Sequence, residues 1–134
     1  MGLSARPLYA DRPGDVLRAI NHVALALADD NATDAMTPFD KSFAKYAKLR
    51  DYFSGLTDSS QLVNEVDIID QQDAGNQSNV TLQWTLTLIN RSTLQSERRS
   101  AEIHVRLNFE GGKWKIVDFS PIDLFNPQSK QRLR

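Results

Sequence analysis

The sequence has no cysteine, only 2 histidines and no long hydrophobic run. The lack of cysteine excludes disulfides, thiolate metal ligands and a cysteine nucleophile. Because the two histidines have no paired spacing, we expect neither a metal site nor a cofactor. No apolar run approaches the ~20 residues that span a bilayer, so we expect a soluble chain without a membrane partner, either cytoplasmic or exported after removal of a leader.

The chain also lacks an excess of charge of either sign. Its 16 basic and 17 acidic side chains leave a formal net charge of -1, so nucleic acid is not an expected partner. There is no G-x-S-x-G elbow and no glycine-rich phosphate loop, which removes support for hydrolase and nucleotide-binding interpretations. What is present is a chain of 134 residues, 40% of them hydrophobic, which is enough for one domain with a single core.

The first half of the chain has the periodicity of helices. Apolar residues recur at helical spacing from Val16 to Leu27, directly after Asp15, which is a natural N-cap. They predict a first helix over about 16–29. The helix is expected to end in the stretch DDNATD, where Asp and Asn compete for backbone hydrogen bonds.

A second helix is predicted over about 39–56. Thr37-Pro38 has the pattern of a helix start, with a capping hydroxyl followed by proline at the first helical position. Apolar residues then follow at steps of three or four. A break near Ser42 stays open as an alternative, and Gly55 is expected to close the helix.

From residue 61 the hydrophobic period changes from 3.6 to 2, which is typical of strands with one buried face. The pattern predicts an α+β fold in which N-terminal helices pack on an antiparallel sheet of about four strands. The strands are expected at roughly 61–71, 78–91, 97–110 and 113–120. The predicted division of the chain is an N-terminal tail (1–14), a single domain (15–127) and a C-terminal tail (128–134).

The last hairpin makes Asp118 a candidate catalytic residue. If Glu110 pairs with Lys113 across two glycines, the antiparallel count places Asp118 opposite Val105, on the apolar face. A carboxylate is costly to bury there, and such burial is an ordinary way in which enzymes prepare an acid or base. The alternative is that the face has reached the open end of the sheet, or that a bulge near Asp118 and Phe119 turns the carboxylate outward.

Aromatic side chains on the inner faces form a large set, most of which we interpret as core. A bent sheet closed on one side by helices leaves a conical space, so some of these rings are expected to line a cavity. The predicted ligand-binding set is Trp84, Trp114 and Tyr46 on the wall of this cavity, with Asp118 at one polar end.

Three stretches carry a resemblance to a known family, namely FDKSFAKYAKLRDYFSGL, LQWTLTLINR and KWKIVDFSPIDLFNP. Over about residues 15–127 the chain resembles the nuclear transport factor 2-like superfamily, and within it a bacterial subgroup of unknown function. SnoaL-like polyketide cyclases and ketosteroid isomerases share this cone-shaped, cystatin-like α+β roll. The resemblance implies a curved sheet around a pocket and a homodimer packed through the outer sheet faces. The catalytic groups of the isomerases and of the dehydratase-type members have no matching positions in this sequence.

Three functions therefore stay open. The first is a non-catalytic dimer that binds a small, mostly apolar ligand in the cone. The second is an isomerase- or cyclase-type enzyme in which Asp118 abstracts a proton next to a carbonyl. The third is a protein-protein interaction module with a packed cone.

Overall fold

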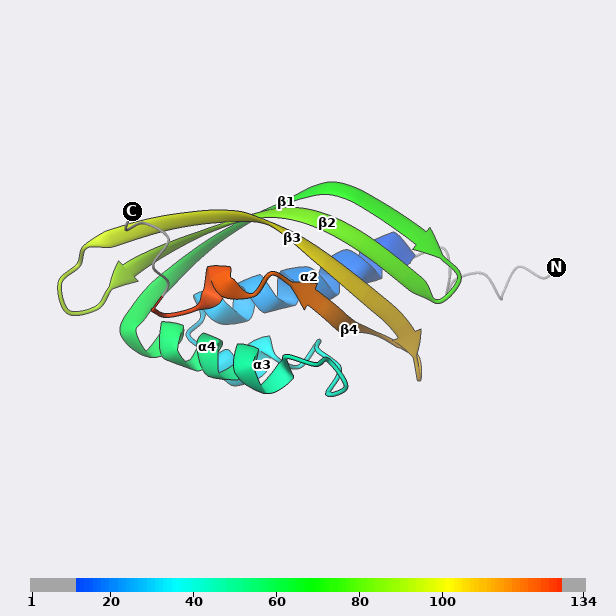
Figure 1. The fold of residues 1–134 in the computed structure, drawn as a ribbon, viewed down its shortest axis with the longest axis horizontal. Coiled ribbons are helices and arrows are strands. Elements are labelled where there is room, and N and C mark those ends of the chain that lie inside the picture. Colours follow the sequence, from blue (N-terminus) through cyan, green and yellow to red (C-terminus); the bar gives the residue numbers. More distant parts are fainter. Residues whose placement is uncertain (1–11, 129–134) are drawn as a thin grey trace.

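The computed structural model describes residues 12–128, which form an α+β domain (Figure 1). The α-helices of this range come first, a four-stranded antiparallel sheet follows with the order β1-β2-β3-β4, and a short 3-10 helix comes last. Of the two predicted tails, residues 1–11 and 129–134 lie outside the described range. The elements are α2 (Arg12–Ala28), α3 (Ala32–Ala35), α4 (Tyr46–Ser59), β1 (Ser60–Ala74), β2 (Gln77–Asn90), β3 (Ser96–Glu110), β4 (Lys113–Ser120) and the short 3-10 helix η2 (Asp123–Phe125).

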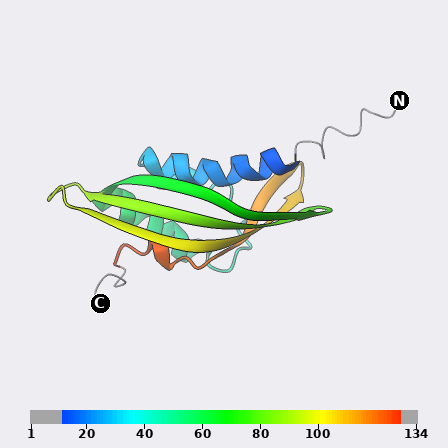
Figure 2. The ribbon, with the colours of Figure 1, turned by 90° about the horizontal axis from the view of Figure 1, so that it is seen from above.

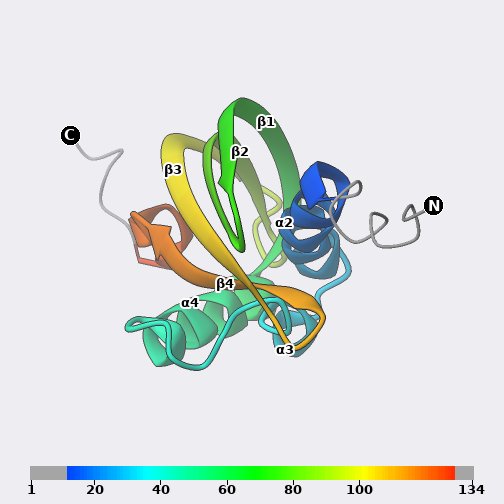
Figure 3. The same ribbon diagram turned by 90° about the vertical axis from the view of Figure 1, so that its right-hand side faces the viewer.

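The sheet is curved, and the helices lie on its concave side. Figure 1 shows the long strands arching over α2 and α4. Seen from above, α2 runs alongside β1 (Figure 2), and the end view in Figure 3 shows α4 below the opposite part of the sheet. The predicted α+β class and the order of helices before strands are confirmed. The period-2 pattern located all four strands to within a few residues.

The first helix begins earlier than predicted. α2 already starts at Arg12, so Asp15 lies in its first turn, near the positive end of the helix dipole, instead of at the N-cap. The helix ends at Ala28, and Asp30 then adopts a positive φ of 60°, a conformation that Asp tolerates better than most residues. No helix within residues 12–128 has the length and apolarity needed to cross a membrane.

The predicted helix over 39–56 is wrong in its first half. Pro38 and Asp40 instead pair with β4: the Asp40 N–H donates to the Ile116 carbonyl at 2.8 Å, and the Ile116 N–H donates to the Pro38 carbonyl at 2.8 Å. These bonds hold the backbone at Phe39 in a parallel bridge to Ile116. The bridge uses backbone N–H and C=O groups that a helix over these residues would need for its own hydrogen bonds. Helix α4 starts only at Tyr46 and continues through residue 55 to Ser59.

Five aromatic rings fill the space between the sheet and the helices. The ring centroid of Phe125 lies 5.3 Å from that of Trp84 and 5.3 Å from that of Phe53, both in edge-on geometry. Phe119 lies 6.0 Å from Trp84 and 5.3 Å from Phe39. All five side chains are at most 2% exposed. Since burying each large apolar side chain contributes roughly 1.5–3 kcal/mol, this cluster is a main source of stability.

Candidate functional site

The concave face of β3 becomes polar toward the start of the strand. Its alternation places Arg99 and Glu97 on the same face as Ala101, and the register pairs Arg99 with Leu86 across the sheet. Arg99 is 4% exposed and is the only buried charged residue among residues 14–128. The sequence prediction considered the alternation only from Ala101 onward. Counting back by two and four residues identifies both charged side chains as inward-facing.

Three hydrogen bonds hold the Arg99 guanidinium in this buried position. Its Nε donates to Glu97 Oε2 at 2.9 Å, and its Nη1 donates to the carbonyl oxygens of Leu124 and Asn126, each at 2.8 Å. The paired carboxylate and the two carbonyls offset the cost of removing a cation from water. Arg99 therefore fixes the C-terminal segment of the domain against the concave end of the sheet.

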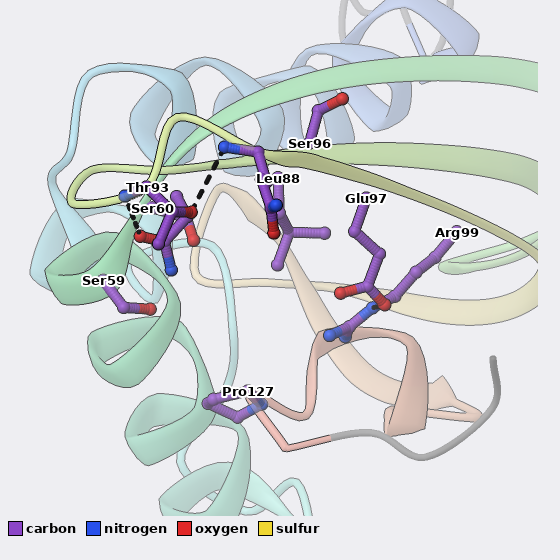
Figure 4. Close-up of a pocket in the computed structure, with 10 residues that line it drawn as sticks. Ser59, Ser60, Leu88, Thr93, Ser96, Glu97, Arg99 and Pro127 are labelled. Atoms are coloured by element: carbon purple, nitrogen blue, oxygen red, sulfur yellow. Dashed lines mark hydrogen bonds and ion pairs between the residues drawn. The ribbon is translucent and has the colours of Figure 1, made fainter. Parts of the chain in front are cut away.

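A cleft of about 340 Å³ lies beside this ion pair (Figure 4). It is bounded by the junction of α4 with β1, by the turn between β2 and β3, and by the C-terminal segment. Hydroxyl and amide side chains dominate its walls, and Glu97 and Arg99 bring one charge of each sign. The lining residues are Ser59, Ser60, Leu88, Asn90, Thr93, Gln95, Ser96, Glu97, Arg99 and Pro127.

The turn that forms one wall of the cleft is held by its own side chains. Asn90 Oδ1 accepts hydrogen bonds from the backbone N–H of Ser92 at 2.8 Å and of Thr93 at 2.9 Å. Leu94 then adopts a positive φ of 63°, and its N–H donates to the Asn90 carbonyl at 2.8 Å. Asn90 thus accepts the hydrogen bonds of the turn N–H groups, which have no strand partner where β2 ends. The cleft wall is therefore preorganised.

The walls of the cleft carry several hydrogen-bonding side chains and two apolar ones. No histidine is among the residues that line the cleft. Among residues 12–128, no group of three or more histidine, aspartate or glutamate side chains is arranged to hold a metal ion. The polar groups on the walls can donate and accept hydrogen bonds to a bound molecule, and the flanking Leu88 and Pro127 provide apolar contact.

The four residues predicted to form one ligand-binding set occupy four different places. Trp84 is fully buried in the aromatic core, where its Nε1 donates to Asn64 Oδ1 at 3.0 Å. Trp114 lines a groove between α2 and β4. Tyr46 lies at the start of α4 beside a separate cleft of about 240 Å³, and Asp118 is on the outer side of the sheet. The structure does not bring them together.

Asp118 is exposed because of a β-bulge. The predicted register holds from Glu110 opposite Lys113 to the middle of the hairpin, but it shifts between Arg106 and Leu107. Asp118 then lies opposite Arg106, not Val105, so the predicted pairing with Val105 is wrong and the bulge considered as the alternative is present. The carboxylate lines a shallow depression of about 140 Å³ and accepts a hydrogen bond from the Phe119 N–H at 3.1 Å.

Comparison with known proteins identifies the fold. No family model matches the sequence, and no curated protein matches it. A nuclear transport factor 2-like superfamily protein from Salmonella enterica superposes with a TM-score of 0.66 at 11% identity, covering 80% of this chain and 88% of that one. A ketosteroid isomerase-like protein from Erwinia carotovora gives a TM-score of 0.66 at 11% identity, covering 81% and 96%.

A third solved structure, a protein of unknown function with a cystatin-like fold from Nostoc punctiforme, gives a TM-score of 0.56 at 17% identity, covering 78% of this chain and 85% of that one. The chain is thus an α+β domain in which helices cover the concave side of a curved antiparallel sheet. Its fold is that of the nuclear transport factor 2-like proteins, as the resemblance of the sequence implied. At these identities the likeness defines the fold and leaves the activity open.

Proposed function

We propose that this chain is a non-catalytic binding domain that takes a small, uncharged, hydroxyl-rich molecule in the cleft beside Arg99. The observation that carries the proposal is the cleft itself, whose volume of about 340 Å³ lies in the ~300–1,000 Å³ range of small-molecule sites. Its walls are built from hydroxyl and amide groups on a preorganised turn. Such walls suit a ligand that both donates and accepts hydrogen bonds.

The balance of charge supports an uncharged ligand. Glu97 and Arg99 already neutralise each other at 2.9 Å, so a charged ligand would meet a repelling group as close as an attracting one. The expected apolar ligand in the cone has less support, because Phe119 and Phe125 occupy the space next to Trp84. The enzyme alternative also has less support, since Asp118 is exposed on the other side of the sheet.

Glucose is a suitable probe because it can be compared with two charged compounds of similar size. Gluconate carries a negative charge and glucosamine carries a positive one. We expect glucose to shift the backbone amide NMR signals of Ser60, Ser96 and Glu97 in a saturable manner, and the charged compounds to bind more weakly. The variant Gln95→Ala removes an amide from the cleft wall and should weaken glucose binding, whereas Gln61→Ala, outside the cleft, should not. Cleft signals that stay fixed, or a preference for a charged sugar, would contradict the proposal.

A second candidate function is self-association through the outer face of the sheet. The centre of this face carries hydroxyl and amide groups that already bond to one another: Gln83 donates to Ser100 Oγ at 2.8 Å, and Thr85 lies 3.0 Å from the same oxygen. Val63 on β1 adds an apolar side chain that is 47% exposed. A polar surface with scattered apolar contacts is typical of homodimer rims and of wet interfaces.

Sedimentation velocity tests the homodimer directly. In a dimer whose two-fold axis passes through the centre of this face, Thr85→Arg would bring two like charges together and should shift the protein to monomer. Thr33→Arg, which places the same charge on the exposed surface of α3, should leave the association unchanged. A monomeric wild-type protein at high concentration would rule out this second function.

A further inference from the structure

The chain passes directly along the cleft beside Arg99 before it reaches its last residues. Pro127 is one of the residues that line this cleft, and Gln128 is the last residue that the structure describes. The chain is held in place just before this point, because Arg99 Nη1 donates to the Asn126 carbonyl at 2.8 Å. The Gln128 N–H in turn donates to Asn126 Oδ1 at 2.9 Å. Residues 129–134 therefore begin at a defined position next to the cleft.

These residues, which we name the basic segment, have the sequence Ser-Lys-Gln-Arg-Leu-Arg, with a positive charge at every second position. The cations are Lys130, Arg132 and Arg134, and the basic segment has no acidic side chain. Since an extended chain spans at most about 3.5 Å per residue, the basic segment can reach roughly 20 Å from its start. Glu97 and Pro127 line the same cleft, so Glu97 lies within this reach.

The cleft presents a carboxylate to such a segment. The Glu97 side chain is 25% exposed, whereas the Arg99 side chain is only 3% exposed. The Arg99 guanidinium donates to Glu97 through Nε and to two backbone carbonyls through Nη1. A cation that reaches the cleft from solvent thus meets the negative member of the pair, and a carboxylate can accept hydrogen bonds from more than one donor.

Tethering favours the chain's own cations over a free charged ligand. A single partly exposed ion pair improves an affinity by roughly fivefold at most, which does not hold a free ligand. A segment joined to the cleft wall by a short stretch of chain, however, is present at an effective concentration on the order of 1 mM. It covers the cleft in half of the molecules when its own dissociation constant is also on the order of 1 mM.

We propose that the basic segment lies across the cleft, with one of its positive side chains at Glu97, and that a ligand has to displace it. Displacement by a ligand rests on the proposed function, whereas the contact between the basic segment and the cleft does not. Because a cleft that is half covered binds its ligand with half of the intrinsic affinity, the basic segment lowers the apparent affinity about twofold.

The full chain with an uncharged segment tests the contact. This neutral-segment variant carries Lys130→Gln, Arg132→Gln and Arg134→Gln, and an acetylated peptide with the wild-type sequence of the basic segment is titrated into it. We expect the peptide to move the backbone amide NMR signals of Ser96 and Glu97 in a saturable manner, with a dissociation constant on the order of 1 mM. Sodium chloride should weaken this binding. A peptide in which glutamine replaces the three cations should leave the signals in place.

Glucose tests the competition. We expect it to bind the neutral-segment variant about twofold more tightly than the wild-type protein, and we expect added wild-type peptide to remove the difference. A control variant with Lys41→Gln, Lys45→Gln and Lys113→Gln loses the same charge from exposed positions outside the cleft. This control should bind glucose with the wild-type affinity.

Glu97→Gln in the neutral-segment variant tests the pairing, because its amide oxygen can still accept a hydrogen bond from Arg99. Peptide binding, followed at Ser96, should weaken about two- to fivefold. Signals that ignore the wild-type peptide, or that respond equally to the uncharged one, would overturn the proposal, and so would equal glucose affinities of the wild-type protein and the neutral-segment variant. Peptide binding without any response to glucose would instead contradict the proposed function and support the contact.

Discussion

Arg99 links the candidate cleft to the packing of the C-terminal segment. Replacing it with methionine removes the hydrogen bond to Glu97 and the two hydrogen bonds to the carbonyls of Leu124 and Asn126. Because breaking a buried pair from one side is strongly destabilising, we expect Arg99→Met to lower the free energy of unfolding by about 3 kcal/mol. Urea unfolding followed by circular dichroism measures this change.

The neighbouring arginine provides the matched control. Arg98 is 72% exposed and lies 3.7 Å from Glu65, so Arg98→Met should change the free energy of unfolding by no more than about 0.5 kcal/mol. The double variant Glu97→Gln with Arg99→Met should lose less than Arg99→Met alone, since the side chain that has lost the Arg99 donor then carries no charge. Equal losses in the Arg98 and Arg99 variants would show that the buried pair does not hold the segment.

Asp40 gives the fold a dependence on pH. The backbone N–H of Ser42 donates to Asp40 Oδ1 at 2.9 Å and, with smaller contributions from the Ser42 hydroxyl and Lys115, lowers the pKa of Asp40. A carboxyl group whose pKa is lower in the folded than in the unfolded state contributes stability above the unfolded value of ~3.9. This stability is lost as the pH falls through the folded pKa.

We therefore expect Asp40→Asn to lower the thermal unfolding temperature near pH 7 and to have little effect near pH 2.5. Calorimetry or circular dichroism at the two pH values measures the difference. Asp58→Asn, on the exposed face of α4, controls for the general loss of one negative charge. If the Asp40 variant were equally destabilised at both pH values, the carboxylate would not be the source of the effect.

At the scale of elements, Gly55 shows how α4 and the C-terminal segment constrain each other. A glycine in the middle of a helix ordinarily costs roughly 0.5–1 kcal/mol relative to alanine, so replacement alone would stabilise α4. However, a Cβ atom at this position would lie 2.7 Å from Pro127 Cγ. Such an overlap requires the docked segment to move, and overpacking typically costs about 1–3 kcal/mol.

We expect Gly55→Ala to be net destabilising, in contrast to its effect in an isolated helix. Gly14→Ala in α2 is the matched control, because its Cβ would lie 3.7 Å from Arg18 Nη1, an ordinary van der Waals contact. This control should be neutral or slightly stabilising by up to about 1 kcal/mol. Urea unfolding of both variants tests the sign, and a stabilised Gly55→Ala would mean that Pro127 does not pack on the helix as described.

The elements differ in how well their sequence predicts them. The strands were predictable because a one-residue slip would move every apolar side chain to the wrong face, so their period extends over the whole strand. The segment from Pro38 to Asp40 was not, since its conformation depends on hydrogen bonds to Ile116, which is far away in the sequence. Local propensity favoured a helix there, and tertiary pairing prevailed over it.

The same distinction applies to the candidate site. The inward position of Arg99 follows from the alternation of β3 and could have been predicted. The cleft could not, because its walls come from the α4–β1 junction, the β2–β3 turn and Pro127, which meet only in the folded chain. The exposure of Asp118 depends on one bulge, and the sequence left both outcomes open.

At the scale of the whole molecule, the domain closes its own cone. The C-terminal segment after β4 carries Phe125 back under the sheet, where its ring contacts Trp84, Phe53 and Phe119. Arg99 bonds to the carbonyls of Leu124 and Asn126, which are the residues directly before and after Phe125 in the chain. An apolar ligand next to Trp84 would therefore have to displace a side chain of the protein.

This arrangement predicts that Phe125→Ala creates an apolar cavity in the cone. We expect the variant to lose about 3–5 kcal/mol of unfolding free energy, the usual cost of truncating a buried phenylalanine. We also expect benzene to raise the thermal unfolding temperature of the variant, because a dry apolar cavity of sufficient size binds such a molecule and ligand binding stabilises the folded state. Thermal unfolding with and without benzene measures both effects.

The wild-type protein and the variant Phe109→Ala serve as controls. Phe109 is only partly buried at the far hairpin, where it contacts Trp114, so its truncation should cost less and should not create a benzene site. If benzene stabilised the wild-type protein as much as Phe125→Ala, the C-terminal segment would have to leave the cone readily. The apolar-ligand function would then regain its support, with Phe125 as the group that the ligand replaces.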